Sequence, residues 1–241
     1  MYTKINPSLE LKESVDAFWL FSSNKFDEKF IICPDTCTDL IFDLNQNIVF
    51  LSGIMTNYQQ IEVQAKSNLL GIRIKSENFG SLLGIPLYEV KNLKIELSEL
   101  LPRFDLDIIN ELKSSETIQK NVNKLEDFLA RALNQNFKRR DELIISVAKK
   151  IRLLKGNLNV VDLATTYQIS LRQLQRRFKN YIGLTIKEFS NIIRFKNAEL
   201  NIKTKSELSI MEIAFEMGYY DHSHMNYEFK RIAGENPSKF R

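Results

Sequence analysis

The sequence has few of the residues that common catalytic and structural chemistries need. Its 241 residues include two histidines, two cysteines, one tryptophan and eight glycines. The glycines never occur at the GxGxxG or GxxxxGK spacings that cradle phosphate groups. Two cysteines, Cys33 and Cys37, are too few for a disulfide scaffold or a four-thiolate zinc site. We therefore expect two reduced thiols, no metal site and no cofactor.

The scarcity of histidine also disfavours several enzyme classes. His222 and His224 are two positions apart and would lie on nearly opposite sides of a helix, so a shared metal ion is not expected. Serine and cysteine hydrolases would lack their usual imidazole base. A Cys33/Cys37 pair that senses oxidants or binds a soft metal is an alternative. Another is a regulator that repairs alkylated DNA through a reactive cysteine, although such proteins use a four-cysteine zinc cluster. We predict that the protein is not an enzyme.

Long apolar runs are absent, and charge is unevenly distributed along the chain. No run approaches the ~18 apolar residues that a membrane span needs, and the first residues have no signal-peptide pattern, so we expect a cytoplasmic protein without membrane contact. Residues 1–136 contain 14 basic and 19 acidic residues, a net charge of −5. Residues 137–241 contain 20 basic and 11 acidic residues, a net charge of +9. The length favours two domains, and the basic one is suited to a polyanion such as nucleic acid.

The N-terminal half shows period-two alternation in short runs between about residues 16 and 76. This pattern predicts strands, for example over 40–44, 61–63 and 72–74, with turns at 34–35, 45–47 and 52–53. A short helix is expected around Phe79, Leu82 and Leu83 and should stop at Pro86. For residues 1–112 we predict an α+β domain, with an antiparallel sheet or small barrel and helices.

A helical period follows, and residues 113–136 are predicted to form a connecting helix. Its apolar stripe has residues every three or four positions: Ile118, Val122, Leu125, Leu129 and Ala132. The stripe could pack on the sheet or pair two subunits. The charged stretch at Lys138, Arg139, Arg140 and Asp141 is the predicted domain boundary, so that residues 137–241 form an all-α domain.

The basic half contains an internal repeat with an offset of about 50 residues. Residues 159–164 (NVVDLA) resemble residues 209–214 (SIMEIA), and Phe178-Lys179, Gly183 and Phe189 recur as Phe229-Lys230, Gly234 and Phe240. Both copies open with a capping residue followed by an acid three positions later, which is typical of a helix start. Each copy then has a short break and a second helix start, and this order predicts a helix-turn-helix motif.

The two turns have different residues. Gly218 supplies the positive φ that a sharp turn needs, whereas the equivalent Gln168 would adopt this conformation at a modest cost. Ser170 and Asp221 are the expected caps of the second helices. Leu171, Leu174 and Phe178 should face inward in the first copy, as should Met225 and Phe229 in the second.

Residues 141–241 resemble the DNA-binding domain of AraC/XylS-type transcription regulators. The likeness rests on the repeated residues above, on the run Leu174-Gln175-Arg176-Arg177-Phe178-Lys179, on Arg194 with Ala198, and on Gly218-Tyr219, Asp221, Ser223 and Pro237. Gln168 and Tyr227, where such proteins often have arginine, depart from the pattern.

The resemblance implies two recognition helices held apart by a linker helix over about 185–205. A separation of ~34 Å would place them in successive major grooves of an asymmetric site of ~20 bp. Arg, Gln and Asn suit base edges, whereas Lys suits phosphate. The predicted DNA contacts are Arg172, Gln175, Arg176, Lys179, His222, Ser223, His224, Asn226, Tyr227, Lys230 and Arg231.

The N-terminal half resembles the uncharacterised N-terminal domain found on one branch of these regulators. By analogy it would sense a small molecule or mediate dimerisation. The candidate ligand contacts are Trp19, Phe21, Cys33, Cys37, Phe42 and Arg73. We expect a transcriptional regulator that binds double-stranded DNA, with RNA polymerase, a small-molecule effector and a second subunit as further candidate partners. The alternative is a DNA-binding protein without an effector, whose N-terminal domain serves for assembly.

Overall fold

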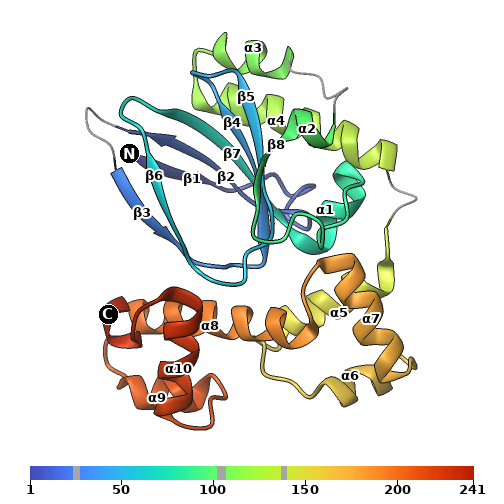
Figure 1. Ribbon diagram of the computed structural model, residues 1–241, viewed down its shortest axis with the longest axis vertical. Helices are drawn as coiled ribbons and strands as arrows, with labels where there is room; N and C mark the ends of the chain where they lie inside the picture. Colours follow the sequence, from blue (N-terminus) through green and yellow to red (C-terminus); the bar gives the residue numbers. More distant parts are fainter. Residues whose placement is uncertain (24–27, 102–106, 137–139) are drawn as a thin grey trace. The chain divides into compact units, whose positions relative to one another are not determined.

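The computed structural model describes residues 1–23, 28–101, 107–136 and 140–241, which form two compact units (Figure 1). The N-terminal unit comprises Met1–Phe30, Cys37–Ile54 and Gln60–Arg140. The C-terminal unit comprises Ile31–Thr36, Met55–Gln59 and Asp141–Arg241. Two residues of the predicted boundary, Lys138 and Arg139, lie outside the described residues, as do the side chains of Leu82, Leu83 and Ala132.

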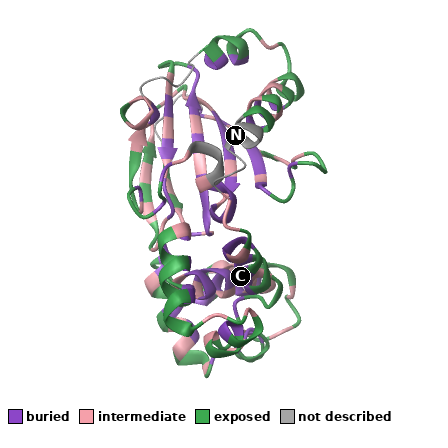
Figure 2. Ribbon diagram, turned by 90° about the vertical axis from the view of Figure 1, so that its right-hand side faces the viewer, coloured by how far each residue is buried: buried purple, intermediate pink, exposed green. Residues whose placement is uncertain are grey.

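An antiparallel sheet forms the centre of the N-terminal unit, as the period-two pattern predicts. Its six strands are ordered β1-β2-β7-β4-β5-β8, and a second sheet pairs β3 with β6. The strands are β1 (Tyr2–Ile5), β2 (Val15–Ser22), β3 (Glu28–Ile32), β4 (Cys37–Asp43), β5 (Ile48–Ser52), β6 (Gln59–Val63), β7 (Asn68–Lys75) and β8 (Lys94–Glu96). The central strands β2, β7 and β4 contain the most buried residues (Figure 2), because each of them has a neighbouring strand on both edges.

Helices complete the described part of this unit. They are α1 (Ser76–Leu83), α2 (Leu97–Leu100), α3 (Asp107–Lys113) and α4 (Ile118–Asn136). The last residue of α1 is Leu83, and its C-cap is Gly84, which adopts φ 69°. The helix therefore stops before Pro86, the residue that was expected to end it. The helix predicted over 113–136 begins later than expected, since α4 starts at Ile118 and Lys113 is the last residue of α3.

The apolar stripe of α4 packs on the sheet. Val122, Leu125 and Leu129 are buried in the same core as the strands, and Phe128 of α4 lies edge-on to Phe42 of β4 at 6.5 Å. Of the two roles that the stripe allowed, the structure therefore shows the packing role within one chain. The buried side chains of α4 stabilise the domain because their apolar area is removed from water.

The C-terminal unit is helical, as predicted. Its elements are α5 (Glu142–Leu153), α6 (Val160–Thr166), α7 (Leu171–Ile182), α8 (Ile186–Thr204), α9 (Ile210–Glu216), α10 (His222–Ala233) and the 3-10 helix η2 (Pro237–Phe240). In Figure 1 the long α8 runs between a group formed by α5, α6 and α7 and a group formed by α9 and α10. Among the described residues, no helix is both long and apolar enough to cross a membrane.

Candidate nucleic-acid interface

The first helix-turn-helix motif consists of α6, a short turn and α7. Asn159 caps α6 by accepting a hydrogen bond from the amide of Val161, and Ser170 caps α7 by accepting one from the amide of Gln173. The turn passes through Gln168, which adopts φ 50° as predicted. The amide of Ile169 then donates to the carbonyl of Ala164 at 3.1 Å and closes the turn.

The second motif repeats this plan in α9 and α10. Ser209 and Glu212 form a reciprocal capping box at the start of α9, and Asp221 caps α10 through the amide of His224 at 2.7 Å. Gly218 takes the left-handed conformation with φ 73°. The amide of Tyr219 donates to Ala214 at 3.0 Å, which is the equivalent of the bond that Ile169 makes in the first motif.

One residue is inserted in the second turn. Tyr219 and Ile169 occupy equivalent positions, but Asp221 follows Tyr219 by two residues, whereas Ser170 follows Ile169 directly. The inserted residue is Tyr220, whose side chain is 86% exposed. The sequence signal for it was a change in the repeat offset from 50 residues in the first helices to 51 in the second.

The α8 helix is the common support of both motifs. Nine of its residues are buried, including Phe189, Ile193, Phe195 and Ala198, because helices pack on several of its sides. Phe189 packs edge-on against Phe178 of α7 at 5.4 Å, and Phe195 packs against Phe229 of α10 at 4.7 Å. The helices α7 and α10 are therefore each anchored to α8 by an aromatic pair.

On α7 the predicted DNA contacts form one exposed stripe. Arg172, Gln175, Arg176 and Lys179 are all exposed, and at ~100° per residue they fall within one side of the helix. Leu174 and Phe178 are fully buried on the other side. Leu171, which was predicted to face inward, is 37% exposed, because it is the first residue of α7 and precedes the part of the helix that packs on α8.

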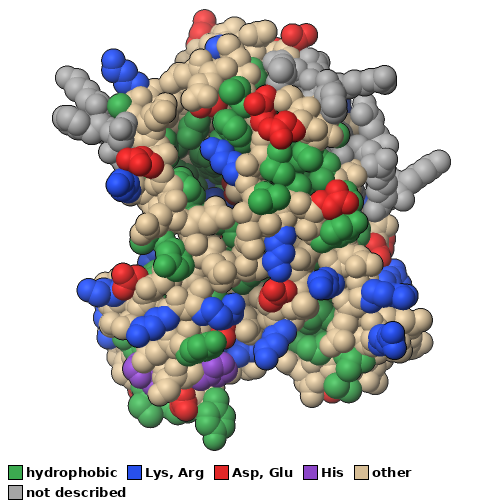
Figure 3. Space-filling view, in the orientation of Figure 1, with side chains coloured by type: hydrophobic (Ala, Val, Ile, Leu, Met, Phe, Trp, Pro, Cys, Tyr) green, Lys and Arg blue, Asp and Glu red, His purple; other side chains and the backbone are tan. Residues whose placement is uncertain are grey.

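On α10 the stripe is present but less complete. His222, Ser223, Tyr227 and Lys230 are exposed, and Asn226 is half-buried, with its amide 3.3 Å from Nδ1 of His222. The space-filling view shows the two histidines on the same face as several Lys and Arg side chains of the C-terminal unit (Figure 3).

Two more predicted contacts on α10, His224 and Arg231, also have partners within the chain. The Nδ1 atom of His224 accepts a hydrogen bond from the amide of Tyr220 at 3.3 Å, and its ring packs on Tyr219. Arg231 pairs with the buried Glu228 at 2.7 Å. At ~100° per residue, both residues lie to one side of the exposed stripe. The geometry thus gives them a supporting place beside the stripe, which sequence alone did not indicate.

Arg177, an arginine of the same basic run, also has a structural partner. Its guanidinium makes a bidentate pair with Asp141, with Nη2 at 2.8 and 2.9 Å from the two carboxylate oxygens. Asp141 is at the same time the N-cap of α5. This pair attaches α5 to α7, so Arg177 positions the first motif rather than adding to the exposed stripe.

The candidate ligand residues do not form one site: Cys33 belongs to the C-terminal unit, and the other five lie at several places in the N-terminal unit. Trp19 donates from Nε1 to Asp39 at 2.6 Å, and Arg73 contacts the same carboxylate at 3.3 Å. Phe42 is fully buried in the core between the sheet and the helices, and Phe21 packs edge-on against Phe30. Cys37 is buried, and burial raises the pKa of the half-buried Cys33 thiol, which disfavours the reactive thiolate.

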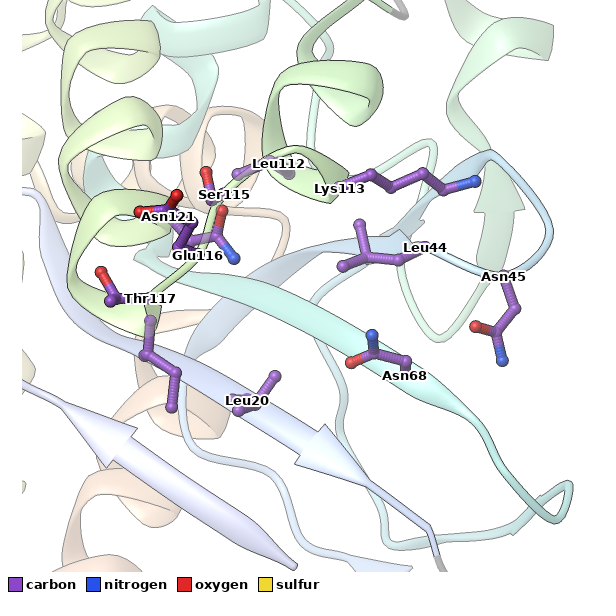
Figure 4. A pocket seen from close by; sticks show the side chains of 11 residues that line it. Leu20, Leu44, Asn45, Asn68, Leu112, Lys113, Ser115, Glu116, Thr117 and Asn121 are labelled. Carbon is purple, nitrogen blue, oxygen red and sulfur yellow. The ribbon is translucent and has the colours of Figure 1, made fainter.

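A pocket of about 420 Å³ lies elsewhere in this unit, and none of the candidate ligand residues lines it (Figure 4). Leu20, Leu44 and Asn68 form its sheet side, and the segment 112–118 with Asn121 forms its helical side. The Oδ1 atom of Asn121 is buried and has no hydrogen-bond partner within the described part of the chain. Carboxamides beside leucines could bind a small polar ligand with an apolar part.

Comparisons with known families match two regions of the chain. Residues 163–241 match the family described as "Helix-turn-helix domain", and residues 3–96 match a family described as "Domain of unknown function (DUF6597)". The first match covers both recognition helices, and the second covers the sheet and α1.

Named relatives resemble part of the chain. The HTH-type transcriptional regulator MtrA of Neisseria gonorrhoeae is 32% identical over 39% of this chain and 31% of its own length. The HTH-type transcriptional activator RhaS of Escherichia fergusonii is 33% identical over 33% of this chain and 28% of its own length. The match thus spans about a third of these relatives. The solved structure of ToxT from Vibrio cholerae is 14% identical over 100% of this chain and 96% of its own, with a TM-score of 0.44.

Proposed function

Because this chain carries an AraC/XylS-type helix-turn-helix domain behind a DUF6597 domain, we propose that it is a transcriptional regulator that reads specific DNA sequences with α7 and α10. The observation that carries the proposal is the pair of exposed polar stripes on two helices that share α8 as their support. The two helices would enter successive major grooves on one side of the duplex.

The residue types on the two stripes support direct reading of bases. Arg172, Arg176 and Gln175 have side chains that make bidentate contacts with guanine or adenine edges. Lys179 and Lys230 suit phosphate oxygens, as do the amides at the starts of the helices. Since the two stripes differ in sequence, the recognised site should be asymmetric. The matched relatives are named as regulators and not as enzymes, in agreement with a binding role.

The N-terminal unit would couple DNA binding to a small molecule, a second subunit or RNA polymerase. The pocket beside Asn121 supports a ligand, since the unsatisfied buried oxygen of that residue lies in it and the carboxamides of Asn45 and Asn68 also line it. The alternative is an assembly module that binds no effector. The two roles differ in one observable: an effector raises the melting temperature or changes operator affinity, whereas assembly depends on protein concentration.

The test is selection of binding sites from a randomised duplex library with the full-length protein at ~150 mM salt, where non-specific affinity is weak. We expect enrichment of an asymmetric motif with two patches about one turn apart. A motif with a single patch would show that one of the two helices does not read DNA. Failure to enrich any motif would contradict the regulator proposal.

A further inference from the structure

Three segments of the C-terminal unit meet at one point, and Arg194 of α8 bonds to two of them. Its Nη2 donates to the carbonyl of Gly156 at 3.0 Å, and its Nη1 donates to the carbonyl of Gly218 at 3.4 Å. Gly156 follows α5 and precedes the first motif, whereas Gly218 is the turn residue of the second motif. We call Gly156, Asn157, Arg194, Gly218 and Tyr219 the junction.

The junction is tightly packed on both sides of Arg194. A Cβ atom on Gly156 would lie 2.1 Å from the carbonyl oxygen of Ser190 on α8, so the segment before the first motif rests directly on that helix. A Cβ atom on Gly218 would lie 2.4 Å from Nδ2 in the side chain of Asn157. The segment before the first motif therefore touches the turn of the second motif, without α8 between them.

The chemistry of arginine suits this position. The guanidinium is planar, permanently charged and has donors in several directions, so one side chain can bond two separate carbonyl groups. Its central carbon also lies 5.5 Å from the centre of the Tyr219 ring, whose hydroxyl is buried. A lysine at this position could satisfy one carbonyl but could not fix the angle between two segments.

We infer that Arg194 is a positioning residue that fixes the two helix-turn-helix motifs relative to each other and thereby sets the spacing of the two DNA patches that the protein accepts. This inference rests on the proposed function, since it concerns how two reading helices are held. One added base pair moves the second patch by ~3.4 Å and rotates it by ~35°. A rigid junction cannot follow this displacement, so the wrong spacing should lose the contacts of one helix.

The experiment measures affinity of the full chain for the selected motif, for versions with one base pair added or removed between the patches, and for a duplex with one patch. Wild type should lose about tenfold or more in affinity when the spacing changes, which is comparable with a mismatch in the site. In Arg194→Gln and Arg194→Lys the loss should shrink to about threefold or less, while affinity for the single patch stays within about twofold of wild type.

A matched control is Lys196→Gln, which removes one positive charge from the same helix. Lys196 pairs with Glu199 and does not belong to the junction, so the Lys196→Gln protein should have the same spacing preference as wild type. Asn157→Ala tests the junction from an exposed position that tolerates truncation. Like the Arg194 variants, it should reduce the loss of affinity that a changed patch spacing causes.

The inference is overturned if the folded Arg194→Lys and Asn157→Ala proteins keep the spacing preference of wild type. It is also overturned if the Arg194 variants lose the same factor on one patch as on two, since that loss would reflect damage to a single motif. Absence of any selected motif for wild type would instead contradict the proposed function, so the two failures can be told apart.

Discussion

The two helix-turn-helix motifs share one backbone plan, yet they present different chemistry to a ligand. The exposed stripe of α7 contains three cations, Arg172, Arg176 and Lys179, whereas the stripe of α10 contains Lys230 with histidine, serine, asparagine and tyrosine. The turns differ as well, with a strained Gln168 in the first and Gly218 followed by an extra residue in the second. The same backbone plan therefore presents one strongly cationic stripe and one stripe with a single lysine.

The largest effect should come from removing a base contact on the cationic helix. Arg176→Ala is expected to weaken binding to the selected motif by ~1 to 3 kcal/mol and to relax preference at one base, because the arginine is exposed at the centre of the stripe. Competition binding on specific and random duplexes measures both quantities. An equal loss on the two duplexes would make Arg176 a phosphate contact instead.

Substitution of the turn residue should have different effects on the stability of the protein at the two turns. Gly218→Ala should lower the free energy of unfolding by more than ~1 kcal/mol, since φ is 73° and the new methyl group would meet Asn157. Gln168→Gly should leave it unchanged or raise it by up to about 1 kcal/mol, because relief of strain is offset by a more flexible unfolded chain. Urea unfolding measures both, and a loss in Gln168→Gly would contradict the strain at this turn.

Salt dependence should separate phosphate contacts from base contacts. Lys179→Gln and Lys230→Gln should each reduce the slope of log affinity against log salt by about 1, because both lysines are assigned to phosphate oxygens, whereas Arg172→Gln and Arg176→Gln, which are assigned to bases, should change the slope less. Ser223→Ala serves as the control, since an uncharged side chain releases no counterions. A reduction of about 1 for either arginine would make that arginine a phosphate contact.

The smallest effect concerns the cap of α9. The backbone hydrogen bond from Ser209 lowers the pKa of Glu212, so its contribution to stability is complete above the pKa of the unfolded chain and is lost as the pH falls through the folded value. Glu212→Gln should therefore melt at a slightly lower temperature than wild type at neutral pH, and this difference should narrow as the pH falls below the ordinary glutamate pKa of about 4.3 and vanish below the lowered folded pKa. A difference in melting temperature that persists in acid would mean that the glutamine side chain destabilises α9 for a reason other than the lost charge of Glu212.

Local patterns in the sequence predicted both motifs well. Ser170, Asp221, Gly218 and the αL Gln168 have the places that capping and turn chemistry assigned to them, because these effects act within four or five residues. The linker expected over 185–205 is α8, flanked by Thr185 and Lys205 as its caps. Strands and the packed stripe of α4 were predictable for the same reason, since periodicity reports which side is buried.

Contacts between distant residues could not be predicted in this way. Arg177 and Arg176 are neighbours in sequence, but the bond to Asp141, 36 positions away, gives them different tasks. The candidate ligand residues were chosen as aromatic or reactive types, yet Phe42 is a core residue and the pocket is lined by asparagines from separate elements. Side-chain partners of this kind depend on the tertiary arrangement, which residue type and spacing do not specify.

The extra residue at Tyr220 limits how the two motifs can be recombined. A chimera that transplants one recognition helix into the other motif by a constant offset would place every side chain of α10 one position, or ~100°, out of phase. The exchange has to be made between Ser170 and Asp221, where the caps coincide and the insertion is left behind. Hybrid regulators built from this scaffold should therefore be joined at the caps, and removal of Tyr220 also removes the amide that donates to His224 of α10.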